Sequence, residues 1–282
     1  MSILNAIMLG VLQGLTEFLP VSSSGHLVLM QKIFGITAPA LFFDTMLHVG
    51  TLIAVFAVLW RDIWDILRRI VQPLTGYLII ATIPAVVLAL AFGDAIEHAF
   101  ESGKFLGVCF FVTTALLVTA ELLSKRANAL GGLKDGGSMN WQDALVIGIM
   151  QAVAIAPGIS RSGATISGAL SRRLDRSFAA RFSFLLSIPA ILGAVVLQAV
   201  KLLKGGAEDA VAGVAVADIA AGESIGAAAI IAGTVSAAIV GFFAMKLMLK
   251  IIRERPLYIF AVYTAVLGAL VIIDQTITHI KF

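Results

Sequence analysis

The stretch QGLTEFLPVSSSGHL (13–27) gathers reactive side chains within a chain that is otherwise apolar. It holds a carboxylate at Glu17, three consecutive hydroxyls at Ser22–Ser24 and an imidazole at His26. Ionisable groups are rare in apolar surroundings, and where they occur they are usually functional or paired. A hydroxyl beside an imidazole places a nucleophile beside a base. The stretch therefore predicts a site for nucleophilic chemistry.

A second polar stretch, PGISRSGATISGAL (157–170), repeats part of this pattern. Shifting the chain by 138 residues places residues 5–27 on residues 143–165, and most positions then pair apolar with apolar. The identical pairs are Ala6 and Ala144, Gly10 and Gly148, Gln13 and Gln151, Ser22 and Ser160, Ser24 and Ser162, and Gly25 and Gly163. Because polar residues are scarce in this chain, their coincidence predicts an internal duplication.

The two copies differ where reactive groups stand. In the alignment, Glu17, Ser23 and His26 fall on Ile155, Arg161 and Ala164. The planar guanidinium of an arginine fits phosphate oxygens, and Gly- and Ser-rich turns at the start of short helices offer backbone N–H groups to anions. We therefore expect the two stretches to bind a phosphate group together. The residues expected to surround it are Gln13, Ser22, Ser24, Gly25, Ser160, Ser162, Gly163 and Thr165.

Each of these side chains also has a plainer structural interpretation, which the sequence leaves open. Ser22 or Ser24 can cap the helix that follows. His26 can be a packed, hydrogen-bonded histidine. Glu17 and Arg161 can form an ion pair that only joins the two stretches.

The segment FFDTMLHVG (42–50) adds two further polar residues to an apolar zone. Asp44 and His48 are four residues apart and therefore share one face of a helix. Two interpretations stay open for them. They can support the site or a metal ion beside it, or they can form a polar contact between two membrane spans.

The composition is that of an integral membrane protein. Of the 282 residues, 60% are hydrophobic and 13% are charged, whereas soluble domains are about 45–50% apolar and about 25% charged. The net charge of +3 is small, and the basic residues lie mostly in short segments. That pattern is typical of topology signals and argues against a nucleic-acid interface. The single cysteine, Cys109, excludes an intrachain disulfide.

The hydropathy pattern predicts two kinds of helix. Six apolar segments are long enough to cross about 30 Å of hydrocarbon: 42–60, 75–92, 104–123, 180–200, 225–248 and 256–274. Two zones, 1–12 and 141–156, are too short, and each is followed by a polar break and a second short piece, 24–34 or 162–171. A half-length helix, a break and another half-length helix predict a re-entrant hairpin, which is tolerated where it is buried in protein.

The fold class follows from counting spans. Each half holds one hairpin and three spans, so the second copy enters the membrane upside down. We therefore expect an all-α integral membrane protein of inverted-topology repeats, each with one re-entrant helix–loop–helix hairpin and three transmembrane helices. The chain forms a single membrane domain (1–282), with repeat one at about 1–124 and repeat two at about 141–274. Sites in this architecture lie near the bilayer midplane, between the repeats.

The charges between spans predict the orientation. Lys and Arg gather in the segments 61–73, 124–140, 171–181 and 246–255. The segments 93–103 and 205–224 contain Asp and Glu but no Lys or Arg. Basic loops face the cytoplasm. This places both termini outside and lets the hairpins enter from opposite faces, with their tips meeting inside the protein.

These features resemble the undecaprenyl pyrophosphate phosphatases, also called the bacitracin-resistance family. The two polar stretches look like that family's signature motifs, and the likeness covers nearly the whole chain. It implies a multi-pass enzyme of the bacterial inner membrane, open to the periplasmic face, that converts undecaprenyl pyrophosphate into undecaprenyl phosphate. The product is the lipid carrier for peptidoglycan synthesis, and the activity confers bacitracin resistance. The implied partners are the polyprenyl pyrophosphate lipid and the bilayer; a homodimer stays open.

The resemblance also implies roles for single residues. Ser23 matches the nucleophilic serine, and Arg161 steadies developing charge. His26 acts as base or as leaving-group acid. Glu17 holds a divalent cation, Mg²⁺ or Ca²⁺, or orients His26. Some family members carry a second glutamate where this chain has Gln13. Gln13 is therefore a weaker metal ligand, as is Asp44, and the phosphoryl group can pass to Ser23 or directly to water.

Two other functions fit parts of the sequence. Inverted repeats with broken helices are typical of secondary transporters, so a transporter or a polyprenyl-phosphate flippase is the main alternative. The tripeptide Ser24-Gly25-His26 also resembles the type-2 phosphatidic acid phosphatases. That class needs a second catalytic histidine and a Lys…Arg-Pro motif. The remaining histidines, His48, His98 and His279, do not stand in such a setting.

Overall fold

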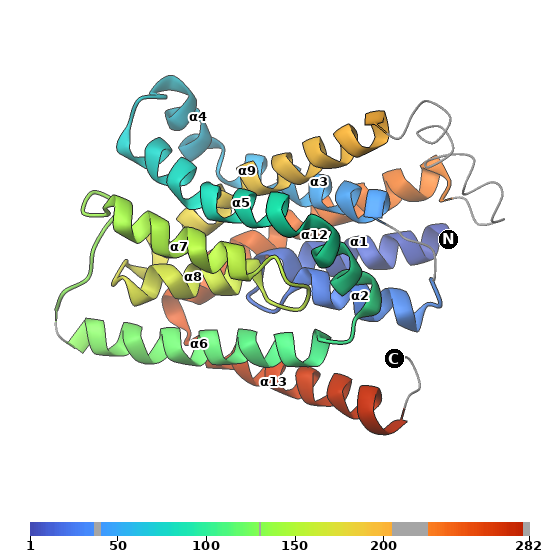
Figure 1. The fold of residues 1–282 in the computed structure, drawn as a ribbon. Helices are drawn as coiled ribbons and strands as arrows, with labels where there is room; N and C mark the ends of the chain where they lie inside the picture. The colour runs from blue at the N-terminus through green and yellow to red at the C-terminus, as the bar shows by residue number, and fades with distance from the viewer. Residues whose placement is uncertain (37–40, 130, 205–224, 279–282) are drawn as a thin grey trace.

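The structure, a computed structural model, describes residues 1–36, 41–129, 131–204 and 225–278. Within these residues the regular structure is helical (Figure 1). The helices are α1 (Ile3–Phe18), α2 (Ser23–Ile33), α3 (Leu41–Val58), α4 (Trp60–Arg68), α5 (Pro73–Ser102), α6 (Leu106–Ala129), α7 (Trp141–Val153), α8 (Arg161–Ser171), α9 (Arg176–Lys204), α12 (Ala227–Glu254) and α13 (Tyr258–Ile273), followed by a π-helical turn (Asp274–Thr278). The predicted all-α class is confirmed.

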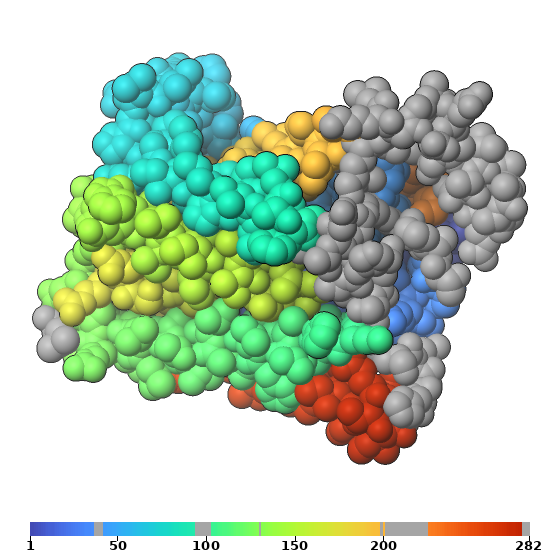
Figure 2. All heavy atoms as spheres, in the orientation of Figure 1, coloured from blue at the N-terminus to red at the C-terminus, as the bar shows by residue number. Residues whose placement is uncertain are grey.

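Five of these helices are long and apolar enough to cross a membrane: α5, α6, α9, α12 and α13. A sixth candidate is α3, which reaches the length of a span only when it is taken together with α4, bent from it by 79°. These six coincide with the six predicted segments. Figure 2 shows α5 on the outer surface of one face, where side chains such as Ile79 and Leu90 are exposed. An apolar surface of this kind belongs in lipid, and the chain is a multi-pass membrane protein.

The two predicted hairpins are pairs of short helices, α1 with α2 and α7 with α8. The break in the first runs over residues 19–22 and the break in the second over residues 154–160. Ser22 caps α2, accepting a hydrogen bond from the Gly25 amide at 3.2 Å. Ser160 caps α8 in the same way, from the Gly163 amide at 3.0 Å. The two polar stretches therefore start their second helices with the same device.

The hairpins pack against the opposite half of the chain. Helix α1 lies along α12, while its counterpart α7 lies along α5. Both contacts need glycine: a Cβ at Gly10 would overlap the backbone of Gly233, and a Cβ at Gly148 would lie 2.6 Å from the Ala81 carbonyl oxygen. Helices α6 and α13 pair directly (Figure 1). This exchange of partners is what a duplication predicts; the inverted orientation and the repeat boundaries stay predictions.

Two predicted loops contain helix instead. Segment 61–73 is mostly α4, whose apolar residues fall on one face. Helix α5 continues through the predicted loop 93–103 as far as Ser102, after a kink at Phe92 (φ −129°, ψ 21°). The acidic segment 205–224 lies outside the described residues. Charge alone marked these segments as connections, and it does not distinguish a loop from a polar or interfacial helix.

One buried ion pair ties four helices together at their ends. The Arg176 guanidinium donates to Glu121 at 2.9 Å and to the carbonyls of Ile252 and Arg255 at 2.7 and 2.9 Å. The same Glu121 oxygen accepts from the Leu257 amide at 2.9 Å. The network joins α6 and α9 to the turn between α12 and α13. Of these helices, α6 and α9 also contact α8 of the second hairpin.

Candidate active site

The tips of the two hairpins meet at a buried ion pair. Arg161, the first residue of α8, donates from Nη2 to Oε1 of Glu17 in the last turn of α1, at 2.9 Å. The Glu17 side chain is only 4% exposed. Beside it, the hydroxyl of Ser162 donates to the Leu19 carbonyl at 3.0 Å. The predicted contact between the two breaks is therefore present.

Glu17 also accepts a hydrogen bond from Ser23, the proposed nucleophile. The hydroxyl of Ser23 donates to Oε2 of Glu17 at 2.6 Å, and Nε2 of Gln13 donates to the same oxygen at 3.0 Å. Hydrogen bonds to an ionised carboxylate are short and strong. Ser23 begins α2, directly after the capping residue, so its side chain faces the end of α1. The carboxylate is thus the group placed to take the serine proton.

His26 lies next to this pair but bonds elsewhere. Its Nδ1–H donates to the Ser22 carbonyl at 2.7 Å, so in the neutral ring Nε2 accepts from the Tyr263 hydroxyl, also at 2.7 Å. The two rings stack with centroids 5.6 Å apart. The structure therefore differs from the expectation that His26 is the direct base for Ser23 or is oriented by Glu17. One ring nitrogen is bonded to the backbone at the start of α2 and the other to α13, so neither is bonded to Ser23 or Glu17.

The paired serines form the frame of the two tips. Ser22 and Ser24 lie with their hydroxyls 3.3 Å apart, and their counterparts Ser160 and Ser162 lie 3.2 Å apart. Thr165, one turn further, donates to the Arg161 carbonyl at 2.8 Å. These residues were expected to surround a phosphate. In the structure their contacts shape the helix starts that such a phosphate would meet.

Gly25 and Gly163 let the two tips approach each other. A Cβ at Gly25 would lie 3.0 Å from the Cα of Gly158, and one at Gly163 would lie 3.4 Å from Cβ of Pro20. Gly158 and Pro20 are themselves counterparts under the 138-residue shift. A Cβ at Gly25 would also lie 2.7 Å from the Phe110 ring. The two glycines therefore allow the breaks to pack closely, and Gly25 has less space for a side chain than Gly163.

His48 joins the site from α3. Its Nδ1–H donates to the Asp44 carbonyl at 2.7 Å, and its Nε2 lies 3.7 Å from Oε2 of Glu17. The Asp44 carboxylate instead accepts from Gln31 at 2.7 Å. With Nδ1 protonated, the facing nitrogen of a neutral His48 and the Glu17 oxygen would both present lone pairs. A positive charge close to both would relieve that repulsion.

The oxygen donors around Glu17 fit a hard divalent cation. Oε1 of Gln13 is buried without a hydrogen-bond partner, beside the carboxylate. Mg²⁺ is usually held by one or two carboxylates together with substrate phosphates. No cluster of three His, Cys, Asp or Glu side chains with metal-ligand geometry occurs in the part of the chain that the structure describes. A cation here would therefore need Glu17, Gln13 and the substrate itself, and Asp44 stands apart from this set.

Two residues of the site were missed by reasoning from the sequence. The Ser183 carbonyl of α9 accepts from Nη1 of Arg161 at 3.2 Å, and its hydroxyl lies 2.6 Å from Oγ1 of Thr165. Tyr263 holds His26 from a span 237 positions along the chain. Ser183 gives no signal that separates it from other polar residues in spans. The tyrosine hydroxyl within an apolar span was the available hint, since a buried Tyr usually finds a partner.

Comparisons with known proteins show to which family the chain is related. Residues 6–270 match the family model described as "Bacitracin resistance protein BacA". The chain is 43% identical over 275 residues to an "Undecaprenyl-diphosphatase 4" of Bacillus thuringiensis, covering 98% of each chain. It is 41% identical to an "Undecaprenyl-diphosphatase" of Carboxydothermus hydrogenoformans, again covering 98% of each chain. It is also 38% identical to one of Methanosphaera stadtmanae, covering 97% of this chain and 98% of the relative.

Proposed function

The chain belongs to the bacitracin resistance protein BacA family, and from that premise we propose that its reaction takes place where Glu17, Ser23 and Arg161 meet. The family and the names of the relatives support an undecaprenyl-diphosphatase, which releases phosphate from undecaprenyl pyrophosphate. The observation that carries the site is the 2.6 Å hydrogen bond from Ser23 to a carboxylate that also binds Arg161. The transporter alternative is not favoured by these names.

The first step is attack by Ser23 on the terminal phosphorus. A bond forms between the serine oxygen and phosphorus, and the proton passes to Glu17. The bond from phosphorus to the bridging oxygen breaks, and the lipid phosphate leaves with its electron pair. A base hydrogen-bonded to the nucleophile is the arrangement that activates a serine hydroxyl.

The second step releases phosphate from the serine. Water attacks the phosphoserine, the serine oxygen leaves and takes back the proton held by Glu17, the protons of the water stay on the released phosphate, and Glu17 is again ionised for the next cycle. Arg161 uses one N–H on Glu17 and one on the Ser183 carbonyl. An arginine has five N–H donors, so three remain for phosphoryl oxygens. Stabilising the charge that develops there is the main catalytic contribution in phosphoryl transfer.

His26 and Tyr263 serve the leaving-group side. Their hydrogen bond couples the imidazole to the hydroxyl of a half-exposed tyrosine. With both ring nitrogens protonated, His26 donates from Nε2 to that hydroxyl, the hydroxyl passes its own proton to the departing lipid phosphate, and His26 is left neutral without touching Ser23. This keeps the leaving-group role expected from the sequence and gives the serine proton to Glu17.

A divalent cation, Mg²⁺ or Ca²⁺, completes the proposal. Glu17 and the unpartnered Gln13 oxygen would hold it beside the substrate phosphates. When bound, it neutralises charge on the pyrophosphate. Because Gln13 is neutral, we expect the cation to bind more weakly than at a site with two carboxylates.

We further propose that the enzyme lies in the bacterial inner membrane, with both termini and the opening of the site on the periplasmic side. The loop charges support this orientation. A cysteine at position 102 should react with an impermeant thiol reagent on intact cells, in a background without Cys109. A cysteine at Gln72 should react only after the membrane is opened. The reverse labelling would contradict the inverted arrangement.

Phosphate release from a prenyl pyrophosphate by the purified protein in detergent tests the function. We expect release in the presence of Mg²⁺ or Ca²⁺, a strong decrease with a chelator, and a phosphoserine at Ser23 in acid-quenched samples. Absence of release under all conditions would contradict the enzymatic function. Release without any phosphoserine would favour direct attack by water that Glu17 activates.

A further inference from the structure

Three of the four basic segments meet in one pocket away from the hairpin tips. Arg61 of α4, Arg181 of α9 and Lys246 of α12 line a hollow of about 550 Å³, together with Asp62 and Asp65. The loop charges alone explain these cations as topology signals. Topology, however, requires only that they lie on one side of the membrane. Their convergence on one hollow is a separate fact.

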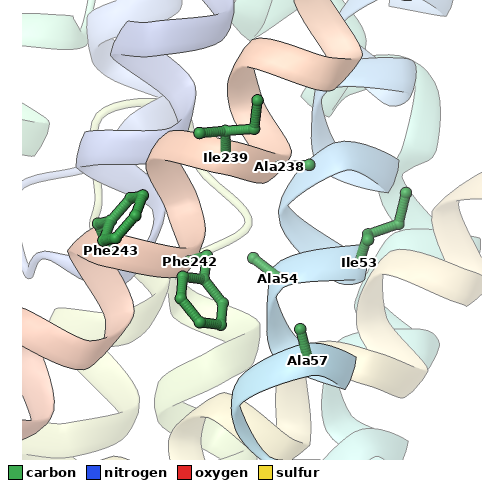
Figure 3. A pocket seen from close by; sticks show the side chains of 7 residues that line it. All are labelled: Ile53, Ala54, Ala57, Ala238, Ile239, Phe242 and Phe243. Atoms are coloured by element: carbon green, nitrogen blue, oxygen red, sulfur yellow. The ribbon is translucent and has the colours of Figure 1, made fainter.

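The charged pocket adjoins an apolar cleft between α3 and α12. The cleft has a volume of about 320 Å³, and Figure 3 shows Ala54 and Ala57 of α3 beside Phe242 of α12 among the residues that line it. Ala57 and Phe242 line both hollows, so the two lie next to each other. A space that is charged at one end and apolar along its length has the chemistry of a lipid: a headgroup and a chain.

Helix α4 places the charged end at the membrane surface. It turns 79° away from α3, so it runs across the direction of the spans. Its Trp60 and Trp64 stack with ring centroids 5.4 Å apart and are 55% and 40% exposed, and Arg68 lies over Trp64 at 4.9 Å. Exposed tryptophans beside basic residues are typical of the interface between lipid and water. The pocket beside α4 is therefore at headgroup depth.

The balance of charge selects the kind of headgroup. Arg181 lies 3.8 Å from Asp62, whereas neither Arg61 nor Lys246 has a carboxylate within ion-pair distance among the residues that the structure describes. Three cations and two carboxylates leave one positive charge. A phosphodiester carries one negative charge, whereas a phosphomonoester carries about 1.5 to 2 near pH 7.

We propose that this pocket binds an anionic glycerophospholipid of the adjoining leaflet. Its phosphodiester contacts Arg61 and Lys246, and one acyl chain fills the cleft between α3 and α12. Basic pockets between spans are known to bind anionic headgroups. Neither hollow includes Glu17, Ser23 or Arg161, so the proposal does not depend on the catalytic mechanism.

Native mass spectrometry of the purified full chain in detergent tests the proposal. We expect phosphatidylglycerol to remain bound in preference to phosphatidylcholine of the same chains. The double variant R61Q/K246Q should bind phosphatidylglycerol about thirty-fold more weakly. Each basic residue near an anionic membrane surface contributes about 1 kcal/mol to binding, and the loss of two such contributions corresponds to about this change in Kd. The variant Ala57→Phe should lower the affinity by filling the cleft while leaving every charge in place.

Arg253→Gln is the matched control, since Arg253 is an exposed cation of α12 that does not line the pocket. It should bind phosphatidylglycerol like the unaltered chain, and all variants should keep their phosphatase activity. Equal binding of the two lipids, or an equal loss in R253Q, would overturn the proposal. Preferential binding of a polyprenyl monophosphate would also overturn it, because the pocket would then hold the reaction product.

Discussion

The two hairpins share a frame and divide the chemistry. Each breaks after a short helix, caps the next helix with a serine (Ser22 or Ser160), and sets a second serine hydroxyl about 3.2–3.3 Å from the cap. Where the first has Glu17 and Ser23, the second has Ile155 and Arg161. The serines and glycines that shape the two helix starts are the same in both hairpins, whereas the residues that form the contact between Glu17, Ser23 and Arg161 differ from their counterparts.

The comparison also explains why the site needs both hairpins. The first alone would bury Glu17 without a cation, which is costly at membrane depth. The second alone would leave Arg161 with only the Ser183 carbonyl. Joined, each supplies the partner that the other lacks, at 2.9 Å. A duplicated hairpin can thus become an active site through a few substitutions at the tip.

The sharpest division between the hairpins is at Ser23, and Ser23→Ala tests it with the largest expected effect. Removing the nucleophile should lower kcat by at least about 10³-fold, because the groups of such a site act as a unit. Phosphate release measures the loss, and the thermal midpoint should change little.

Ser24→Ala is the control for this experiment, since Ser24 is the adjacent hydroxyl with a counterpart in the second hairpin. It should retain most activity. Substantial turnover by Ser23→Ala would show that the first hairpin contributes a base and no nucleophile, with an activated water attacking instead.

Arg161→Lys tests whether the second hairpin contributes to catalysis or only pairs with the first. Lysine keeps the charge but cannot contact Glu17, the Ser183 carbonyl and a phosphoryl oxygen with one planar group. We expect kcat/KM to fall by at least about 10²-fold, the size of losing one preorganised donor. Activity near that of the unaltered protein would reduce the second hairpin to a structural partner of Glu17.

The sequence predicted the frame better than the contacts within it. The six spans, the two breaks and the meeting of Glu17 with Arg161 follow from hydropathy and from a 138-residue repeat. The hydrogen bond from Ser23 to Glu17 was not predicted, because spacing along the chain places His26 three residues away but does not say where its ring points. A helix start turns consecutive side chains about 100° apart, so the near neighbour in sequence is not the near neighbour in space.

Contacts between distant spans were beyond this reasoning. His48 reaches Glu17 from α3, and Tyr263 reaches His26 from α13. Nothing local in the sequence identifies which polar residue of a span meets which hairpin, since packing of whole helices decides it. Helix α4 was missed for another reason: its charges satisfy the topology rule whether the segment is a loop or an interfacial helix.

Tyr263→Phe probes the contact that the second hairpin lacks, since Ala164 replaces the histidine there. The change removes the hydroxyl that binds Nε2 of His26 and keeps the stacked ring. We expect kcat to fall about ten-fold, less than for a group in direct contact with the phosphorus. The pH profile of kcat should change shape, because His26 has lost a hydrogen-bond partner.

Tyr258→Phe is the matched control, because Tyr258 lies on the same helix and contacts Lys125 instead. It should leave both rate and pH profile unchanged. If Tyr263→Phe also leaves the pH profile unchanged, then His26 and Tyr263 only pack the first hairpin against α13.

The smallest expected effects concern the shared caps, where the hairpins perform one duty with different backbones. Ser22→Ala and Ser160→Ala should each lower the free energy of unfolding by about 0.5–2 kcal/mol, the usual cost of losing a helix cap. Activity should change only a few-fold. Ser22, however, has a positive φ of 72°, whereas Ser160 has a φ of −70°. Glycine accepts positive φ without strain, so Ser22→Gly should be distinctly more stable than Ser22→Ala.

At position 160 φ is negative, so glycine relieves no strain there. Ser160→Gly should therefore be more stable than Ser160→Ala only by the amount by which glycine is the better capping residue. Thermal unfolding of the alanine and glycine variants at Ser22 and Ser160, measured in one detergent, therefore gives the difference in stability between glycine and alanine at each position. The difference at 22 should exceed the difference at 160, because the first hairpin has its positive φ at the capping serine itself, whereas the second has its positive φ at Gly158 (φ 94°), two residues before the cap. Equal differences would show that the positive φ of Ser22 costs the first hairpin no stability that glycine could recover.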